Sequence, residues 1–213
     1  MLPFTTAPYR EHAATWPAAG RHILAHHDAD TIVVYQAYRP AIAEHAVRHQ
    51  RFGGEFSLGR MSWIKPSFLW MMYRAGWATK PGQEHVLAIR LTRAGFDAIL
   101  ARAVHASYER DVYGDRTAWQ AALVASDVRL QWDPDHDPSG APQVRRAIQL
   151  GLSGATLREY VEDWCVSITD ITPFVAAQRA HVNDRDALIV PVESVVPVRD
   201  PEVAGRLRLS AIA

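Results

Sequence analysis

The chain has 213 residues, of which 48% are hydrophobic and 22% are charged. These proportions are typical of a globular protein and exclude extensive disorder. Its 23 Lys and Arg residues balance its 23 Asp and Glu residues, so the formal net charge is zero. A protein that coats nucleic acid usually has a basic excess, because phosphate neutralisation dominates such binding. We therefore expect any nucleic-acid contact to be local.

The length of the chain favours one domain with a full hydrophobic core. We expect this domain to span residues 21–200, with an N-terminal arm at 1–20 and a C-terminal tail at 201–213. The single cysteine, Cys165, excludes an intrachain disulfide. No signal-peptide pattern and no apolar run of about 18 residues is present, so we expect a cytoplasmic protein with no membrane partner. The oligomeric state does not follow from the sequence.

The first half of the chain predicts two strands, each followed by a helix. Thr31–Tyr38 is rich in β-branched and aromatic residues, which favours a buried strand, and Pro40 then begins a helix that ends near His49. Arg60–Lys65 resembles a second strand. Pro66–Ala75 resembles a helix that Gly76 ends. Because this helix is apolar almost all round, we expect it to be buried.

The second half continues with strands and helices that do not alternate regularly. His85–Leu91 predicts a strand, and Thr92 is the expected cap of the next helix. Further strands are expected at 128–133, 146–150, 188–191 and 194–198, the last two closing the sheet, with helices around Trp119, after Ser153 and at Thr172. The fold class is therefore α+β, a single domain with a mixed or largely antiparallel sheet and flanking helices.

The segment from Arg60 to Arg74 is the main candidate for a binding site. Its two arginines, Lys65 and Ser67 flank a cluster of aromatic and methionine residues. Ser67 lies in the first helical turn, where free backbone N–H groups and the helix dipole attract anions. Lys65 and Arg60 would reinforce a phosphate or carboxylate site. The alternative is a core helix whose charged ends reach solvent.

Polar residues within two strand regions are further candidates. Gln36 interrupts an apolar strand, and a buried glutamine needs partners for its amide. It is expected either to form hydrogen bonds within the sheet or to contact a ligand amide or ribose. The later strands have a polar face that either lines the same pocket or is the solvated side of an antiparallel sheet. That face consists of Arg129, Gln131, Asp133 and Gln149.

No metal site is expected. Asp133, Asp135 and Asp137 alternate as in a calcium loop, but the positions that need glycine and glutamate hold proline and valine. His45 and His49 have a spacing that can bind a metal, but the order of the neighbouring residues favours a solvated helix face. The glycine-rich motifs of Rossmann dehydrogenases and P-loop ATPases are absent from the sequence.

Several sequence blocks resemble those of the domain-of-unknown-function 4291 family. The hallmark blocks are Val-Tyr-Gln-Ala-Tyr38 and the run from Arg60 to Arg74. Further matches occur at 128–134, 146–152 and 168–173, so the resemblance covers roughly residues 20–200. Membership of this family does not by itself supply a function.

A more distant resemblance is to the ADP-ribosyltransferase superfamily, especially its DNA-modifying branch. Its members hold the nicotinamide end of NAD with a first strand and helix, then present an arginine on a strand and a glutamate near a late strand. Tyr35-Gln36, Arg60 and Glu193 occur in that order, although Gln36 stands where many members have His or Arg. The resemblance implies an ADP-ribosyltransferase-like fold in which Arg60 binds phosphate and Glu193 orients the ribose or activates the nucleophile. The alternative for Glu193 is an exposed carboxylate at a strand edge.

The leading functional hypothesis is an NAD-using ADP-ribosyltransferase-like enzyme that acts on a nucleobase, nucleic acid or small molecule. One alternative is a non-catalytic module that binds a nucleotide or another anionic small molecule. Another is an interaction protein whose aromatic residues form the core. The expected catalytic residues are Glu193, Arg60 and Gln36, and the expected cofactor contacts are Tyr35, Gln36, Tyr38, Arg60, Trp63, Lys65, Ser67, Arg74 and Gln131.

Overall fold

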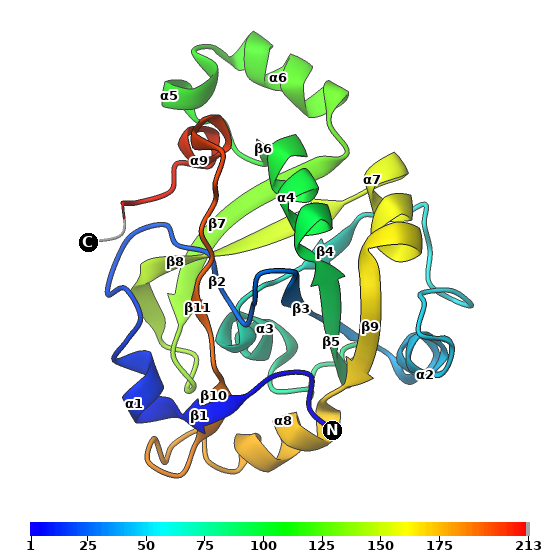
Figure 1. Cartoon of the computed structure of the whole chain (residues 1–213), viewed down its shortest axis with the longest axis vertical. Coiled ribbons are helices and arrows are strands. Elements are labelled where there is room, and N and C mark those ends of the chain that lie inside the picture. Colours follow the sequence, from blue (N-terminus) through cyan, green and yellow to red (C-terminus); the bar gives the residue numbers. More distant parts are fainter. Residues whose placement is uncertain (212–213) are drawn as a thin grey trace.

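The computed structural model describes residues 1–211 and contains two main β-sheets (Figure 1). The first is antiparallel, in the order β3 (Thr31–Tyr38), β5 (His85–Thr92) and β9 (Cys165–Asp170). The second has the order β4 (Ser62–Ile64), β8 (Pro142–Leu152), β7 (Val128–His136) and β6 (Ala103–His105). In this sheet β6 pairs with β7 in parallel, while the other pairs are antiparallel. The α+β class with a mixed sheet is therefore confirmed.

The two sheets meet where β3 contacts the end of β4. The backbone N–H of Tyr35 donates to the carbonyl of Lys65 at 2.7 Å, and the N–H of Lys65 donates back at 3.1 Å. Within residues 1–211, this isolated bridge is the only backbone pairing between the two strands. Toward Tyr38 the strands therefore separate, and we call the space between them the fork.

Helices pack on both sides of the sheets. They are α1 (Tyr9–Ala13), α2 (Pro40–His49), α3 (Phe68–Ala75), α4 (Arg93–Arg102), α5 (Arg110–Tyr113), α6 (Arg116–Ala125), α7 (Gly154–Glu159), α8 (Thr172–Arg179) and α9 (Pro201–Leu207). A π-helical turn, Tyr160–Trp164, follows α7 directly. The predicted strand at 31–38 and helix at 40–49 are confirmed. The helix predicted from Pro66 begins only at Phe68, and its predicted burial is confirmed.

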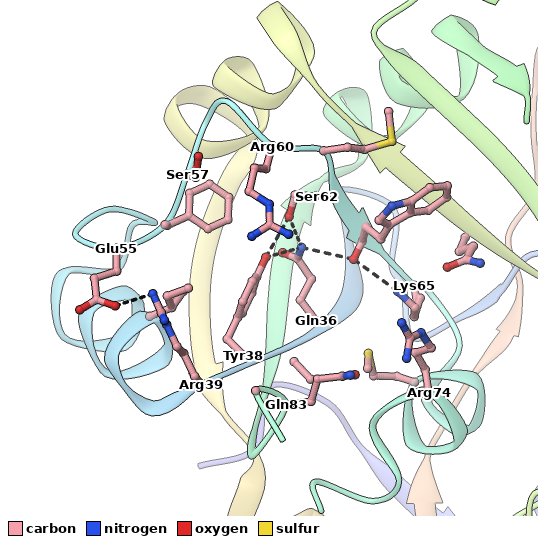
Figure 2. Close-up of a pocket in the computed structure, with 18 of the residues that line it drawn as sticks. Gln36, Tyr38, Arg39, Glu55, Ser57, Arg60, Ser62, Lys65, Arg74 and Gln83 are labelled. Atoms are coloured by element: carbon pink, nitrogen blue, oxygen red, sulfur yellow. Dashed lines mark hydrogen bonds and ion pairs between the residues drawn. The ribbon is translucent and has the colours of Figure 1, made fainter. Parts of the chain in front are cut away.

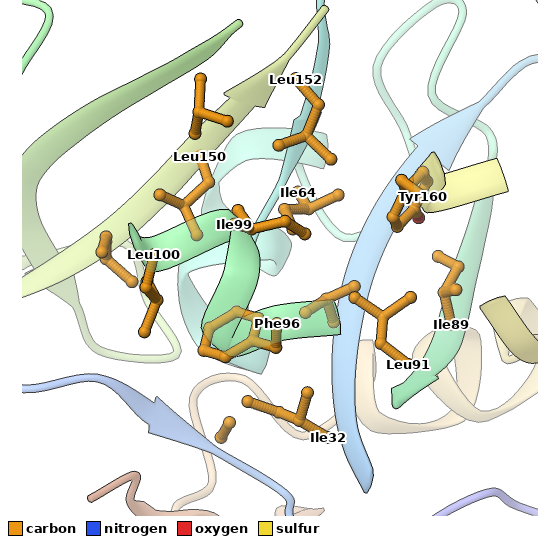
Figure 3. Packing of buried hydrophobic residues seen from close by; sticks show 14 of the residues in the cluster. Ile32, Ile64, Ile89, Leu91, Phe96, Ile99, Leu100, Leu150, Leu152 and Tyr160 are labelled. Carbon is orange, nitrogen blue, oxygen red and sulfur yellow. The ribbon is translucent and has the colours of Figure 1, made fainter. Parts of the chain in front are cut away.

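Alternating residues of β3 point into two separate hydrophobic clusters. Ile32 and Val34 belong to the cluster that lies between the two sheets, while Val33 and Tyr35 belong to the cluster beneath α3 and α8. Helix α4 fills the space between the sheets, where its residue Phe96 is fully buried (Figure 3). Because β3 is covered on both faces, its sequence is almost continuously apolar.

The two ends of the chain pack into the fold more closely than predicted. Residues 1–20, expected to form an arm, contribute Phe4, Tyr9 and Trp16 to the core, and the expected tail contains α9, whose Leu207 is fully buried. The strands β10 (Ile189–Pro191) and β11 (Ser194–Val195) do not close a main sheet as expected. They pair instead with β1 (Thr6–Pro8) and β2 (Leu24–Ala25). Within the described chain, no helix combines the length and apolar character needed to cross a membrane.

Candidate anion-binding site

A pocket of about 570 Å³ lies at the fork between β3 and β4 (Figure 2). It receives side chains from both strands, from the loop before β4, from α3, and from β7 and β8 of the second sheet. Seven of the predicted site residues line it, namely Gln36, Tyr38, Arg60, Trp63, Lys65, Arg74 and Gln131. The structure thus brings together residues that are far apart in the sequence. We call this cavity the fork pocket.

The fork pocket has an excess of positive charge. Arg60, Lys65 and Arg74 line it, and within residues 1–211 none of them forms an ion pair with an acidic side chain. The fourth cation, Arg39, is paired with Glu55 at 2.5 Å, and both side chains are more than half exposed. The chain as a whole is neutral, so this unpaired charge is a local feature of the pocket.

Lys65 is the most unusual of these cations because it is buried. The residue is only 5% exposed, and the nearest hydrogen-bond acceptor of its ammonium is the carbonyl of Trp63 at 3.5 Å. Burial and then the neighbouring charge of Arg74 lower the pKa of Lys65 to about 8, while Asp133 opposes this effect. A buried ammonium without an anionic partner is costly and is often found where a ligand supplies the missing charge.

Gln36 holds the two strands together across the fork. Its amide nitrogen lies 2.7 Å from the hydroxyl of Tyr38, 2.8 Å from that of Ser62 and 3.3 Å from the carbonyl of Trp63. Its amide oxygen accepts a hydrogen bond of 2.7 Å from the Tyr160 hydroxyl. Groups of the protein therefore bond both the nitrogen and the oxygen of this amide. This agrees with the first of the two alternatives for Gln36, in which it forms hydrogen bonds within the protein. Gln36 forms a wall of the pocket and offers no free group to a ligand.

The second sheet contributes two glutamines from neighbouring strands. Gln131 of β7 lies opposite Gln149 of β8, and both line the fork pocket. Their amide nitrogens donate to the two carboxylate oxygens of Asp133, at 3.0 and 2.8 Å. Because a carboxylate only accepts, the amide oxygens of both glutamines point away from it and remain available to donors. The fourth residue of the predicted polar face, Arg129, instead donates to the carbonyls of Ser126 and Leu123.

Two predicted cofactor contacts, Tyr35 and Ser67, do not line the fork pocket. Tyr35 is fully buried on the opposite face of β3, where its ring packs edge-on against Phe68. Adjacent residues of a strand point to opposite faces, so Tyr35 and Gln36 cannot face the same space. Ser67 precedes α3, but its side chain forms no capping hydrogen bond.

Glu193, the predicted catalytic carboxylate, also lies outside the fork pocket that Arg60 lines. Its carboxylate accepts a hydrogen bond of 2.7 Å from the backbone N–H of Phe68 at the start of α3, and the residue is 1% exposed. Burial raises the pKa of Glu193 well above its usual value, and the Phe68 N–H partly offsets that rise. A carboxyl group of the chain itself therefore occupies this helix start, where a ligand anion was expected. Glu193 is likewise not the exposed strand-edge carboxylate of the alternative.

Several residues that line the pocket or support its walls were not predicted from the sequence. Ser62 and Tyr160 hold Gln36 in place, while Gln83 and the loop around Glu55 line the pocket. Ser62 had one sequence signal, because it lies two residues before Ile64 and is therefore a polar residue on an apolar strand face. The other residues had no such signal, because loops and helix ends place their side chains according to long-range packing.

The alternating aspartates of the sequence make their contacts with other residues of the protein. Among residues 1–211, no three His, Cys, Asp or Glu side chains gather closely enough to hold a metal ion. Asp135 is instead paired with the buried Arg145 at 2.6 Å. Burial raises the pKa of Cys165 to about 11, so its thiol is protonated at neutral pH.

The fold and the site define an α+β protein with a cationic pocket at the fork between two sheets. A family model described as "Domain of unknown function (DUF4291)" matches residues 22–197. The chain belongs to this family, as its sequence blocks predicted. No protein with a curated description matches the chain.

Proposed function

We propose that this protein binds a nucleotide or another phosphorylated small molecule in the fork pocket. The observation that supports this proposal is the convergence of Arg60, Lys65 and Arg74, without acidic partners, on one cavity of a neutral chain. Like charges that share a pocket repel one another, and burial makes the charge of Lys65 costly. A bound phosphate relieves both effects.

The lining suits the two ends of a nucleotide. Guanidinium groups such as those of Arg60 and Arg74 bind phosphate oxygens in a planar, bidentate geometry. The free amide oxygens of Gln131 and Gln149 can accept hydrogen bonds from the N–H groups of a base or a carboxamide. The volume of about 570 Å³ falls within the range of roughly 300–1,000 Å³ that is typical of small-molecule sites.

ADP-ribosyl transfer would be a further step after binding, with NAD as the ligand. In that reaction Arg60 keeps its proposed role as a phosphate contact. A carboxylate beside the ribose is also needed, whereas Glu193 is buried at the start of α3 and the pocket's own Glu55 is paired with Arg39. The geometry therefore favours nucleotide binding over transfer, and NAD enters the test as one ligand among several.

The proposal is tested by thermal unfolding with ADP, ATP, NAD, inorganic pyrophosphate and adenosine. A ligand present at 100 times its dissociation constant should stabilise the fold by about 2.7 kcal/mol. Arg60→Ala and Arg74→Ala should each weaken phosphate binding by at least about tenfold, because each removes a charge-assisted hydrogen bond. The matched control is Arg48→Ala, which removes an exposed arginine outside the pocket. The absence of a shift with every phosphate, or shifts that survive in the Arg60/Arg74 double variant, would contradict the proposal.

Nicotinamide release from NAD, followed in the same samples, separates transfer from binding. Turnover that is lost in both Arg60→Ala and Glu193→Gln would support the ADP-ribosyltransferase hypothesis. NAD binding without turnover would limit the function to binding.

A further inference from the structure

The chain uses lysine at only two of its 23 basic positions, Lys65 and Lys80, and arginine at the other 21. Lys80 is exposed and donates to the carbonyls of Tyr73 and Arg74 at the end of α3. Lys65 is buried in the fork pocket. An arginine would hold a phosphate at least as well, but a guanidinium cannot lose its proton at physiological pH. Lysine at this position therefore offers something that arginine cannot, namely a nucleophilic amine.

The surroundings of Lys65 favour the neutral amine. No acidic side chain pairs with it, burial disfavours its charged form, and the cation Arg74 adds repulsion. With a pKa of about 8, roughly a tenth of the amine is neutral at pH 7, which is far more than for an ordinary lysine. The backbone of Lys65 is fixed by two hydrogen bonds to Tyr35, so the side chain starts from a rigid position.

We propose that Lys65 forms a reversible imine with the carbonyl group of an anionic ligand that Arg60 and Arg74 hold in the fork pocket. The substrate class is a phosphorylated aldehyde or ketone. This inference rests on the proposed function, since the two arginines are the groups that bring the carbonyl to the amine.

The reaction balances without any oxidant or reductant. The lone pair of the neutral Nζ adds to the carbonyl carbon, forming a C–N bond, and the carbonyl π electrons move to oxygen. That oxygen takes one of the two nitrogen protons, which gives a carbinolamine. The C–O bond then breaks, and the hydroxyl group leaves as water together with the second nitrogen proton. The C=N bond of the imine remains, and water reverses both steps.

The test uses pyridoxal 5′-phosphate as the probe, with sodium cyanoborohydride to trap any imine as a stable amine. The two lysines and the N-terminal amine are the primary amines of the chain, so peptide mass mapping assigns each adduct to its residue. Lys65 should be labelled at least about ten times faster than Lys80 at pH 7, because far more of it is neutral. Pyridoxal, which lacks the phosphate, should label Lys65 at least about tenfold more slowly, because the charge-assisted contacts are lost.

Matched variants make the result specific. Lys65→Arg should abolish the fast adduct and leave the Lys80 adduct unchanged, whereas Lys80→Arg should do the reverse. If Lys65→Arg does not fold, Lys65→Met serves the same purpose. Inorganic pyrophosphate, which has no carbonyl, should slow the labelling of Lys65 by competition.

The outcomes distinguish this inference from the proposed function. Stabilisation by pyrophosphate with no preference of the probe for Lys65 would overturn the imine and leave phosphate binding intact. Fast labelling of Lys65 that is equal for pyridoxal and its phosphate, with no stabilisation by any anion, would overturn phosphate binding and with it the role given to Arg60 and Arg74. Equal labelling rates of Lys65 and Lys80 would contradict the claim that Lys65 is an unusually reactive amine.

Discussion

Replacing Lys65 with methionine is expected to stabilise the fold while it weakens anion binding. Burial lowers the pKa of Lys65 from 10.5 to about 8, so the ammonium costs free energy in the folded protein at neutral pH. A pKa difference of about 2.5 corresponds to roughly 3.4 kcal/mol, at about 1.4 kcal/mol for each tenfold change. Methionine has a similar length and fits irregular apolar space without this cost. Allowing for altered packing, we expect Lys65→Met to gain about 1–3 kcal/mol at pH 7.

The pH dependence of this gain identifies its cause. Between pH 8 and 10.5 the unfolded chain keeps the Lys65 proton that the folded chain has lost. The wild-type protein therefore gains stability as pH rises through this window, and the advantage of methionine shrinks to nothing near its upper end. Urea unfolding of both proteins at pH 7 and 9.5 measures this difference, with Lys80→Met as an exposed control. A variant that is less stable than wild type at pH 7, or a gain of equal size at both pH values, would refute the reasoning.

Three further substitutions test the groups around the pocket. Glu193→Gln keeps an acceptor for the Phe68 N–H, so it should lie within about 1 kcal/mol of wild type at neutral pH, whereas Glu193→Ala should cost about 2–4 kcal/mol. Because folding raises the pKa of Glu193, the free energy of unfolding should fall as pH rises above 4.5. Urea unfolding at pH 5 and 7 should show this fall in the wild type and not in the two variants. Gln36→Leu leaves the Tyr160 hydroxyl without its acceptor and should lower the free energy of unfolding by about 2–4 kcal/mol, as measured by thermal unfolding. An unchanged stability would contradict the stabilising role given to the hydrogen bonds of Gln36. Gln149→Leu should weaken adenosine nucleotides about five- to tenfold in calorimetry, because it removes an acceptor for the base, and equal weakening of pyrophosphate would contradict that role.

The elements that could be predicted from the sequence are those fixed by local chemistry. β3 is rich in apolar and β-branched residues, and Pro40 begins α2 at the residue expected. Thr92 caps α4, as predicted, by accepting a hydrogen bond of 3.1 Å from the N–H of Gly95. Gly76 ends α3 in the left-handed conformation that glycine favours. Each of these signals lies within a few residues of the structure that it specifies.

The remaining features depend on residues that are distant in the sequence. Ser153 directly precedes α7, but its side chain forms no capping hydrogen bond, and the carboxylate of Asp127 accepts the N–H of Ala155 at 2.9 Å instead. Glu193 does the same for α3 across 125 positions of the chain. A long-range cap has no local pattern, so the sequence could suggest an acceptor at the start of α3 but not that Glu193 provides it. Membership of the fork pocket was predictable for Lys65, which lies just before a helix that had to be buried, and for Arg60, which lies before the preceding strand.

The fork itself explains why these cations lie where a ligand can reach them. If β3 and β4 paired along their full length, backbone hydrogen bonds would close the space that the pocket occupies. Instead, the side chain of Gln36 spans the gap and provides the polar partners that the missing ladder would have given. The sheets thus stay joined while a cavity remains open between them. Burial of Lys65 beside Arg74 destabilises the folded protein, and under the proposed function a bound anion would remove that cost. The arrangement that weakens the free fold would then strengthen the proposed complex.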